Sequence, residues 1–492
     1  MKLHDFIPIL NAKENRELDQ YTCRKQEQSA LDLMERAAFA CASKILKLYP
    51  KAKGFQVLCG FGDNGGDGLA IARMLAEQGH RVEVYLMVGE KRSPDNFINL
   101  QRLTLQPQPL SALVPDDEAV VIDALFGIGL TRGLEAHSTA YLSALFDEIR
   151  DSGAQVVAID VPSGLWSNQS GAKVVLRAHH TLCLGAIKPS LLWAEYEAYV
   201  GQLHFLDIGL EHIEAPCYQL TALGLAVNQP QQSAFIHKGD RGRVVMVAGS
   251  EQYYGAAVLA AKAALRMGCG LLSARIPERW RCAFHQNVWE AMTFAENEHP
   301  KAQALLVGCG LGRERSRLGE LKALCQHYAE IPSVWDADAI HLLAEDESLQ
   351  QHLPRGAILT PHVKEFERLT GFVLESDAER VEAARAVARD LGVTLVLKGR
   401  YTVIASPNAP VFINPTGNTG LAKGGSGDVL AGMMAGLLAQ GYEPLLAAMT
   451  AVFLHGRAAE LAALEQHVQS MLPSDLLHYF AQAWRSLEVA KP

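Results

Sequence analysis

The order of apolar and polar residues along the chain predicts alternating strands and helices. An amphipathic helix is expected over residues 29–49, with Ser29 and Asp32 as its N-terminal cap. Its apolar face would consist of Leu33, Met34, Ala37, Ala38, Cys41, Ile45 and Leu48. A buried strand at 55–59, a glycine-rich loop at 60–68 and a helix over 69–78 follow. That order is typical of a βα phosphate-binding unit.

Further apolar runs predict a mostly parallel sheet covered on both faces. Strands are expected at 82–88, 119–125 and 155–159, with helix-length segments between them. A second series of elements begins after residue 235. It comprises strands at 243–247, 271–276, 304–307, 333–335 and 357–360, a helix over 256–267, a hairpin over 393–405, a strand at 411–413, and apolar helices after Gly427 and over 445–461.

A domain boundary is expected where this pattern weakens, between about 210 and 235. Residues 228–232 read Asn-Gln-Pro-Gln-Gln, which has the composition of a linker. The chain of 492 residues is long enough for two or three domains. We therefore predict two α/β domains, over 1–225 and 226–492.

Composition narrows the class of protein. A hydrophobic content of 49% with 20% charged residues is ordinary for a soluble globular protein. The net charge of −9, without any basic run, argues against nucleic acid as a partner. No stretch reaches the roughly 18 apolar residues of a membrane span, and the N-terminus lacks the apolar core of a signal peptide. Nine cysteines without a Cys-x-x-Cys pair predict reduced core thiols, hence a cytoplasmic protein without a membrane partner.

The densest candidate chemistry lies at residues 414–428, Asn-Pro-Thr-Gly-Asn-Thr-Gly-Leu-Ala-Lys-Gly-Gly-Ser-Gly-Asp. Glycines that end where an apolar helix begins predict free backbone N–H groups and a helix N-terminus facing an anion. Asp428 falls in the first helical turn, where the helix dipole favours the ionised carboxylate. It could act as a base on a hydroxyl beside a phosphate, so the segment predicts phosphoryl transfer. The alternative is a tight turn that Asp428 merely caps.

Polar residues also follow two strands of the first half. Asp123 closes one apolar run, and residues 160–164, Asp-Val-Pro-Ser-Gly, close another. Ligands bind at the carboxyl edge of open α/β sheets, so both carboxylates are candidate site residues. On their own, Asp123 and Asp160 could equally well cap the turns that follow them.

Motifs in both halves resemble known enzyme families. In the second half, 237–243 (His-Lys-Gly-Asp-Arg-Gly-Arg), 360–362 (Thr-Pro-His) and 424–428 (Gly-Gly-Ser-Gly-Asp) resemble the ADP/ATP-dependent NAD(P)H-hydrate dehydratases of the ribokinase-like superfamily. The first half resembles the NAD(P)H-hydrate epimerases through 63–68 (Asp-Asn-Gly-Gly-Asp-Gly), Asp123 and 160–165 (Asp-Val-Pro-Ser-Gly-Leu). The resemblance covers about 25–460, in the order of the bifunctional bacterial repair enzymes. It implies an N-terminal Rossmann-like α/β/α sandwich and a C-terminal ribokinase-like α/β domain.

The resemblance implies that the substrate is NADH or NADPH hydrated at C6 of the nicotinamide ring. One epimer would be dehydrated directly, and the other would first be epimerised. Phosphorylation by ADP (or ATP) with Mg²⁺ would turn the C6 hydroxyl into a good leaving group. Asp428 would deprotonate that hydroxyl, and Gly425, Ser426 and Gly427 would offer backbone N–H groups to the phosphate. The assembly would be a homo-oligomer.

For the dehydratase half, the resemblance also implies two sets of contacts. The adenine nucleotide would be bordered by Lys398, Gly399, Arg400, Tyr401, Thr402 and Gly427. The hydrate would be bordered by Ala257, Gly312, His362 and Asp428. Taken alone, His362 reads more readily as a structural polar residue. The chain has Val363-Lys364 where the family continues with Pro-Gly.

For the epimerase half, the resemblance implies a dinucleotide site with a potassium ion beside it. The dinucleotide would contact Asp63, Asn64, Gly65, Gly66, Asp67, Gly127, Ile128, Gly129, Leu130, Thr131, Arg132, Gly133 and Asp160. Potassium would take oxygen ligands from Asn64, Asp123 and Ser163, and hard oxygen donors suit such a cation. Asp160 would carry protons, and Asp63 departs from the family, which has Asn there.

Two other classes of function stay open at this point. One is a ribokinase-like small-molecule kinase with a nucleotide-sensing N-terminal domain. The other is a non-enzymatic scaffold, because similar domains act in RNA decay, although a scaffold needs neither Asp160 nor Asp123. The sequence leaves open the phosphoryl donor, the oligomeric state, the preference between NADH and NADPH hydrates, and the route of epimerisation.

Overall fold

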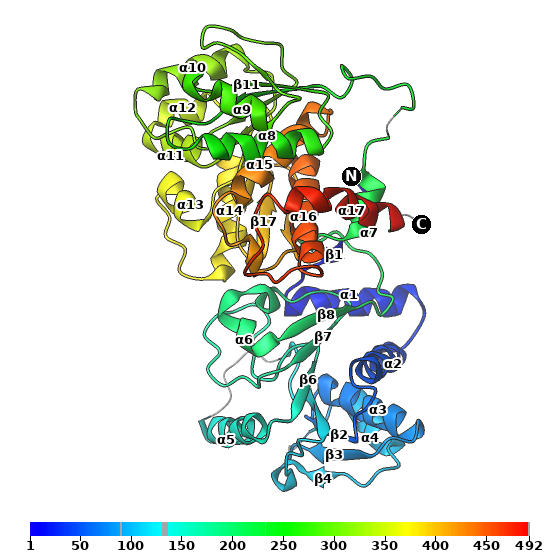
Figure 1. Cartoon of the computed structure of the whole chain (residues 1–492). Helices are drawn as coiled ribbons and strands as arrows, with labels where there is room; N and C mark the ends of the chain where they lie inside the picture. The colour runs from blue at the N-terminus through cyan, green and yellow to red at the C-terminus, as the bar shows by residue number, and fades with distance from the viewer. Residues whose placement is uncertain (89–90, 130–135, 232, 491–492) are drawn as a thin grey trace. The chain divides into compact units, whose positions relative to one another are not determined.

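A computed structural model describes residues 1–88, 91–129, 136–231 and 233–490, and the chain forms two compact units (Figure 1). The first unit is Pro8–Ala215 with Ser376–Ala378, and the second is Met1–Ile7, Pro216–Glu375 and Glu379–Pro492. The contacts change from one unit to the other between Ala215 and Pro216, near the expected boundary at 225 and 226. The reason is strand β9 (Cys217–Gln219), which pairs with β18 (Val411–Asn414) inside the second unit. Strand β1 (Ile7–Pro8) extends the same sheet beyond β9.

The first unit is built on a seven-stranded parallel sheet with strand order β4-β3-β2-β5-β6-β7-β8. The strands are β2 (Gly54–Cys59), β3 (Val82–Leu86), β4 (Gln108–Pro109), β5 (Ala119–Ala124), β6 (Gln155–Ile159), β7 (His180–Leu184) and β8 (Gln202–Leu206). The order runs outward in both directions from β2 and β5, as in a doubly wound sheet. The expected Rossmann-like class is confirmed.

Helices cover both faces of this sheet. They are α1 (Ala12–Lys25), α2 (Ala30–Leu48), α3 (Asp63–Glu77), α4 (Pro94–Arg102), α5 (Ala136–Ser152) and α6 (Glu197–Val200). One core cluster joins Ala38 and Ile45 of α2 to Leu69 of α3 and to the sheet. A second cluster places Leu142 and Ile149 of α5 on the other face. The helix expected over 29–49 is confirmed, and Ser29 and Asp32 form its capping box.

The glycine-rich segment at 60–68 is not the loop that the sequence predicted. Helix α3 begins at Asp63, so the glycines lie in its first turns. They permit close packing, because a Cβ atom on Gly65 would lie 2.1 Å from the Gly60 carbonyl oxygen. A Cβ atom on Gly68 would lie 2.6 Å from the Ala124 side chain. Tertiary packing thus overrides the low helix propensity of glycine.

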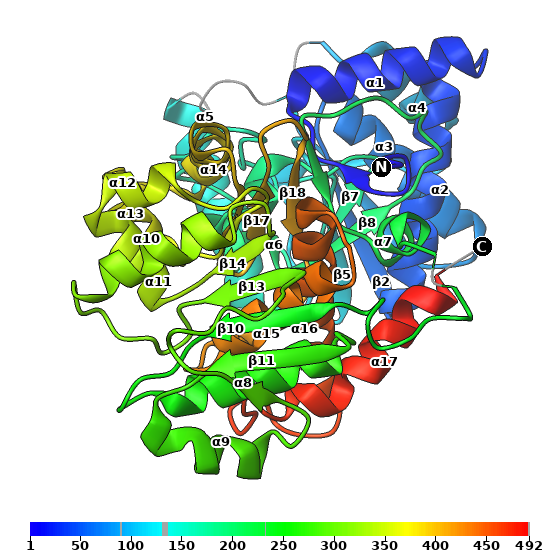
Figure 2. The same cartoon turned by 90° about the horizontal axis from the view of Figure 1, so that it is seen from above.

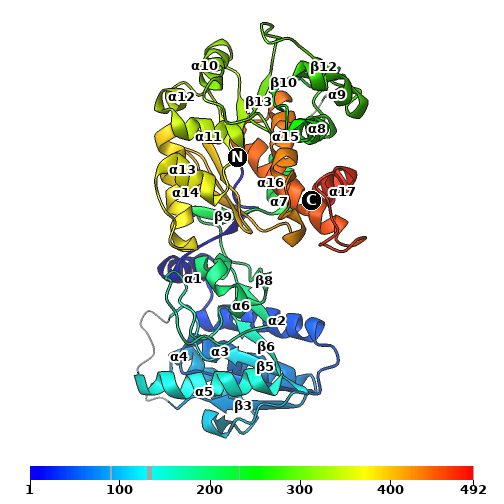
Figure 3. The ribbon, with the colours of Figure 1, turned by 60° about the vertical axis from the view of Figure 1, so that its left-hand side comes forward.

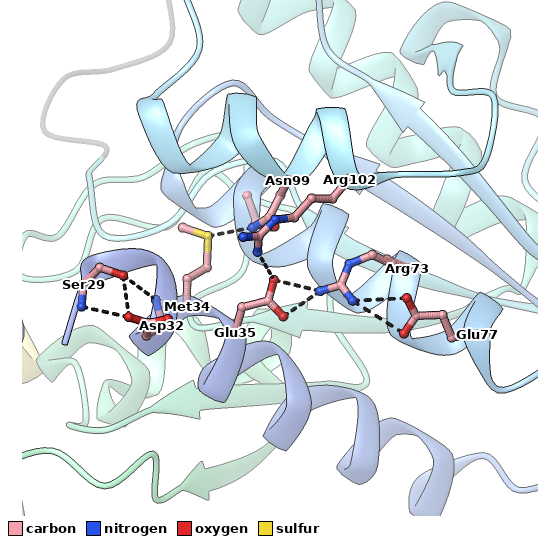
Figure 4. Close-up of polar contacts among 9 residues, drawn as sticks. Ser29, Asp32, Met34, Glu35, Arg73, Glu77, Asn99 and Arg102 are labelled. Atoms are coloured by element: carbon pink, nitrogen blue, oxygen red, sulfur yellow. Dashed lines mark hydrogen bonds and ion pairs between the residues drawn. The ribbon is translucent and has the colours of Figure 1, made fainter.

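Polar contacts tie α3 to its two neighbouring helices (Figure 4). Glu35 of α2 accepts hydrogen bonds of 2.7 and 2.6 Å from Arg73 of α3, and one of 3.0 Å from Arg102 of α4. Asn99 of α4 donates to the Gly66 carbonyl at 3.3 Å. The Arg73 contacts hold the C-terminal half of α3 against α2, and the Asn99 contact holds its N-terminal turns against α4.

The second unit contains an eleven-stranded mixed sheet with order β1-β9-β18-β17-β16-β15-β14-β13-β10-β11-β12. Its other strands are β10 (Arg243–Val247), β11 (Leu271–Arg275), β12 (Met292–Thr293), β13 (Ala304–Val307), β14 (Ser333–Trp335), β15 (Ile358–Leu359), β16 (Thr394–Leu397) and β17 (Thr402–Ala405). The strands from β12 to β16 pair in parallel, and β17 pairs antiparallel with both β16 and β18. The expected strands and hairpin are confirmed.

Two groups of helices flank this sheet, with α10, α11, α13 and α14 on one side and α8, α15 and α16 on the other (Figure 3). The bounds are α7 (Ala222–Asn228), α8 (Tyr254–Arg266), α9 (Arg281–Asn287), α10 (Arg317–His327), α11 (Asp338–Glu345), α12 (Glu347–Gln351), α13 (Val363–Thr370), α14 (Asp377–Leu391), α15 (Ser426–Ala439), α16 (Pro444–Ala462) and α17 (Leu476–Val489). Helix α15 packs on α8 and on β10, β13 and β14 (Figure 2). A Cβ atom on Gly432 would lie 2.2 Å from the Ala260 carbonyl oxygen, so glycine permits this approach.

Helix α16 is long and apolar enough to cross a membrane by length and composition. In the structure, however, 72% of its most apolar window is buried inside the protein. It contacts α15, α17 and the strands β16 to β18. Its apolar surface is therefore accounted for by the core of the second unit.

Candidate active sites

Asp336 is the centre of the polar cluster in the second unit. It directly follows β14 and is 1% exposed. Its Oδ1 accepts hydrogen bonds from Thr360 Oγ1 at 2.7 Å and from Lys398 Nζ at 2.9 Å. The next residue, Ala337, has φ of 51°, an unfavourable value for a residue with a Cβ atom. Backbone strain of this kind is concentrated at functional sites.

Asp428 lies beside this cluster, in the first turn of α15. The Cys309 Sγ atom and one carboxylate oxygen each of Asp336 and Asp428 all lie within 4.8 Å of one another. Burial, reinforced by the neighbouring Asp336 carboxylate, raises the pKa of Asp428 to about 7. The helix dipole therefore does not keep Asp428 fully ionised at neutral pH, since a carboxyl with a pKa of about 7 is then about half protonated. Desolvation beside a like charge outweighs a dipole contribution on the order of 0.3–1 kcal/mol.

The N-terminus of α15 opens toward the same cluster. Its cap is Gly425, with φ of 101°, and no side chain caps the helix in the described structure. The Ser426 N–H donates to the Lys423 carbonyl at 3.3 Å. The backbone N–H groups of Gly427 and Asp428 are thus the ones available to an anion. A Cβ atom on Gly427 would lie 3.4 Å from both Asp336 Oδ2 and Lys398 Nζ. The structure therefore brings Gly427, Lys398 and Asp428 together.

The residues expected at the nucleotide continue from Lys398 into a tight turn between β16 and β17. Thr402 Oγ1 donates to the Gly399 carbonyl at 3.1 Å. A Cβ atom on Gly399 would collide with the Arg380 guanidinium at 2.4 Å. The Arg400 guanidinium lies 4.8 Å from the centre of the Tyr401 ring. Lys398 thus faces Asp336, whereas 399–402 form the turn beyond it.

The residues expected at the hydrate have different surroundings. Ala257 is fully buried on α8. The backbone N–H of Gly312 donates to Asp338 Oδ2 at 3.0 Å. His362 caps α13, where its Nδ1 accepts from the Glu365 N–H at 3.3 Å and Val363 is the first helical residue. This contact supports the structural reading of His362.

Asp160 is the focus of the polar site in the first unit. It directly follows β6 and has φ of 66°, a second strained non-glycine backbone. Asp160 Oδ1 accepts from the Leu184 N–H at 3.1 Å and forms an ion pair with Lys188. Lys188 is 1% exposed and also donates to the Leu184 carbonyl at 3.0 Å. Burial lowers the pKa of Lys188, but the Asp160 carboxylate more than offsets this and the net shift is upward.

Further carboxyl groups surround this ion pair. Burial, together with the charges of Asp160 and Asp63, raises the pKa of Asp67 well above its usual range. Burial also raises the pKa of Asp19 on α1 to about 6, against the attraction of Lys188. Because Asp19 and Asp67 interact, their protonation is coupled. A carboxyl group whose pKa lies near the working pH can both accept and donate a proton during a reaction.

The residues expected at potassium lie at the ends of β5 and β6 and in α3. Asp123 is fully buried; its Oδ2 accepts from the Ser163 N–H at 2.8 Å, and its Oδ1 accepts from Ser163 Oγ at 2.5 Å. Burial raises the pKa of Asp123 to about 6. The buried Asn64 Nδ2 has no hydrogen-bond partner in the described structure. A Cβ atom on Gly127 would lie 3.1 Å from Asn64 Cβ, so this glycine lets the segment after β5 approach α3.

The remaining residues expected at the dinucleotide divide into two groups. Ile128 and Gly129 follow Gly127 in the described chain, and Gly129 is exposed. Leu130, Thr131, Arg132 and Gly133 lie outside the described residues.

The two sites differ in how well their donor atoms suit the expected metals. Asn64, Asp123 and Ser163 supply amide, carboxylate and hydroxyl oxygens, the donor set that suits a hard cation. The group of Cys309, Asp336 and Asp428 has the spacing of metal ligands. A thiol is nevertheless a poor ligand for Mg²⁺, and Lys398 already neutralises Asp336. Mg²⁺ bound through the nucleotide phosphates therefore suits this site better than an ion bound directly by Cys309, Asp336 and Asp428.

Sequence reasoning missed the residues Lys188, Asp19, Asp336 and Cys309. Asp336 could have been found by the strand-end rule that identified Asp123, because it directly follows the apolar run 333–335. Lys188 and Asp160 are separated by 28 positions, and nothing in the sequence shows that they meet.

Comparisons with known proteins agree with this geometry. Residues 244–482 match the family model described as NAD(P)H-hydrate dehydratase, and 30–190 match that of the YjeF-related protein N-terminus. The chain is 31% identical to the bifunctional NAD(P)H-hydrate repair enzyme of Moorella thermoacetica, covering 98% of this chain and 97% of that one. It is 31% identical to the Escherichia coli enzyme of the same name, covering 90% and 88%.

Solved structures resemble the second unit. The ADP/ATP-dependent NAD(P)H-hydrate dehydratase of Bacillus subtilis, co-crystallised with ATP and Mg²⁺, has a TM-score of 0.50 and 33% identity over 54% of this chain and 97% of that one. A ribokinase-like superfamily protein of Enterococcus faecalis has a TM-score of 0.51 and 28% identity over 57% and 99%. The fold and sites thus define a fused two-domain α/β protein with a Rossmann-like and a ribokinase-like half. The chain belongs to the family of bifunctional NAD(P)H-hydrate repair enzymes.

Proposed function

We propose that the chain repairs hydrated NADH and NADPH with two activities. The first unit interconverts the R and S hydrates, and the second dehydrates the S form at the expense of ADP. Family membership supports both activities. The observation that carries the second is Asp428, with its pKa raised to about 7, beside the uncapped N-terminus of α15. The epimerase domain is proposed over 1–225 and the dehydratase domain over 226–492.

In the dehydratase, Asp428 removes the proton from the C6 hydroxyl as that oxygen attacks the terminal phosphate of ADP. The backbone N–H groups of Gly427 and Asp428 and the dipole of α15 stabilise charge on the phosphoryl group in transit. Mg²⁺ bound with the nucleotide supplies further neutralisation of phosphate charge. The phosphate then leaves C6 with its bonding electrons, assisted by the lone pair of the ring nitrogen. Loss of a proton from C5 to water re-forms the C5–C6 double bond and restores the dihydronicotinamide.

In the epimerase, Asp160 moves a proton at the hydrated end of the nicotinamide ring. Lys188 holds the carboxylate in place and stabilises its charge. Asn64, Asp123 and Ser163 would hold a potassium ion, which supplies a fixed positive charge next to the ring. This role is supported by the amide, carboxylate and hydroxyl oxygens that the three residues offer.

The two alternative functions are less well supported. A simple kinase would stop at the phosphorylated product, and relatives matched over nearly the full length are repair enzymes. A scaffold would need no buried Lys188–Asp160 pair. All nine cysteines are free thiols, which favours a reducing, cytoplasmic location. Assembly into a homo-oligomer stays a prediction.

Incubation of the protein with a mixture of R and S hydrates tests both activities. We expect NMR to show exchange between the epimers without nucleotide. Added ADP should restore the absorbance of the reduced nicotinamide and release phosphate, and ATP in place of ADP identifies the preferred donor. Accumulation of a stable phosphorylated hydrate would instead support a kinase, and the absence of epimer exchange would contradict the role of the first unit.

Replacement of Asp123 tests the cation site. Asp123→Ala is expected to weaken potassium activation of epimerisation by about 10-fold or more, because it removes a fully buried oxygen donor. Asp123→Asn, which keeps the shape and one oxygen, should retain part of it. Exchange rates are measured by NMR in potassium and in tetramethylammonium salts. A wild-type rate that does not respond to this exchange of cations would show that the cluster is only structural.

Replacement of Asp63 tests the departure from the family residue. Asp63 is exposed at the start of α3, and its negative charge contributes to the raised pKa of both Asp19 and Asp67. Asp63→Asn should lower the KM for the hydrate a few-fold, on the order of 1 kcal/mol, by removing repulsion from the dinucleotide phosphates. The kcat should not change. The difference in KM between the wild type and Asp63→Asn should shrink at higher salt, because the Debye length becomes shorter. Equal KM values for the two proteins at low salt would show that the Asp63 charge does not affect substrate binding.

A further inference from the structure

Cys309 is a buried thiol that the proposed reaction does not use. It lies after β13 in the segment 308–312, Gly-Cys-Gly-Leu-Gly, and is fully buried. Its carbonyl oxygen accepts from the Gly249 N–H at 2.9 Å. Gly308 has φ of 115°, and a Cβ atom there would lie 2.0 Å from the Asp336 carbonyl oxygen. The backbone on both sides of Cys309 is therefore held in place, and its side chain is fully buried.

The thiol lies close to the carboxyl groups of both Asp336 and Asp428. Its Sγ atom lies within 4.8 Å of one carboxylate oxygen of each. Burial, reinforced by the charges of Asp428 and Asp336, raises the pKa of the Cys309 thiol well above its usual range. The group therefore stays protonated, and beside two carboxylates it acts as a donor.

We propose that Cys309 is a positioning residue of the dehydratase, whose S–H group donates to one oxygen of Asp428 and thereby turns the other oxygen toward the substrate hydroxyl. The proposal rests on the proposed role of Asp428 as the base. A hydrogen bond to one carboxylate oxygen restricts rotation of the carboxyl group. It also stabilises the ionised form, which is the form that accepts the proton.

The other groups that face Asp428 have different partners. Asp336 is bound by Thr360 and by Lys398, whose Nζ lies 2.9 Å away, and Asp338 accepts from Gly312 and Arg313. The charges of Asp336 and Asp338 raise the pKa of Asp428, whereas Lys398 and the Cys309 hydrogen bond lower it. Removing the thiol therefore removes the side-chain hydrogen bond that orients the base.

Substitutions at Cys309 test the proposal through the dehydratase kinetics. Cys309→Ala should lower kcat on the order of 10-fold, leave both KM values unchanged, and move the acid limb of the pH profile to higher pH. Cys309→Ser, which keeps a donor, should restore most of the rate and reverse the shift. Cys325→Ala removes a buried thiol of the same unit without a charged partner and is the matched control. An unchanged kcat and pH profile in Cys309→Ala, or a serine variant as slow as alanine, would overturn it.

An infrared measurement decides the point independently of activity. The S–H stretching band missing from Cys309→Ala identifies this thiol in the wild type. That band should move toward weaker hydrogen bonding in Asp428→Asn, because an amide oxygen is a weaker acceptor than a carboxylate. If the frequency of the S–H band is the same in Asp428→Asn as in the wild type, the contact between Cys309 and Asp428 is refuted, even if Asp428 proves essential. An active Asp428→Asn enzyme would instead refute the base while the band still reports the contact. If Cys309→Ala does not fold, Cys309→Ser provides the difference spectrum.

Discussion

Asp428→Asn is expected to lower nucleotide-dependent dehydration by about 10²- to 10⁴-fold, the range for a lost general base. Asparagine keeps the shape of the side chain but cannot take the proton from the C6 hydroxyl. Epimerisation should be unchanged, because the residues proposed for it all lie in the other unit. The measurement compares recovery of reduced nicotinamide with epimer exchange in the same preparation. Asp390→Asn, the same change at an exposed position of α14, is the control.

The pH dependence gives this prediction a second test. The pKa of Asp428 is raised to about 7, so below this value the carboxyl is protonated and cannot act as a base. The kcat/KM for dehydration should therefore rise with pH through about 7 and level off above it. Residual activity of Asp428→Asn should lack this limb. A variant that keeps near-normal activity or the same acid limb would contradict the assignment of the base.

Most strands of both units could be predicted because each is a short apolar run ended by polar or glycine residues. The strands at 243–247, 304–307 and 333–335 are observed with those same bounds. The start of α3 could not be predicted, because glycine disfavours helix in isolation. Only the packed structure shows that 2.1 and 2.6 Å approaches leave no room for a Cβ atom at Gly65 and Gly68.

The candidate sites were predictable only in part, for a related reason. Asp428 and Asp160 stand out because each sits where an apolar element meets a glycine-rich turn. The groups that set their chemistry come from distant parts of the chain, as Cys309 does for Asp428 and Lys188 for Asp160. Their effect is electrostatic and depends on burial, which no local pattern records. The direction of the Asp428 pKa shift was mispredicted for that reason.

Asp160→Asn is expected to lower epimerisation by about 10²- to 10⁴-fold without affecting dehydration of the S hydrate. The substitution removes the carboxylate that moves the proton. It also leaves the Lys188 ammonium, 1% exposed, without its ion-pair partner. Removing one member of a buried pair costs on the order of 3–5 kcal/mol, so loss of folding must be separated from loss of chemistry.

Lys188→Met separates a loss of folding from a loss of chemistry, because it removes the positive charge and keeps an apolar side chain of similar length. In this variant Asp160 stays in place beside Asp67 and Asp19, and without the ammonium the pKa of each nearby carboxyl should rise. Epimerisation should then fall at neutral pH and recover as the pH is raised, since the carboxylate is still present. Asp160→Asn should not recover at any pH. Asp117→Asn, at an exposed position of the same unit, is the matched control for the charge change in Asp160→Asn. Equal pH profiles for Lys188→Met and the wild type would show that Lys188 does not hold Asp160 in its ionised form.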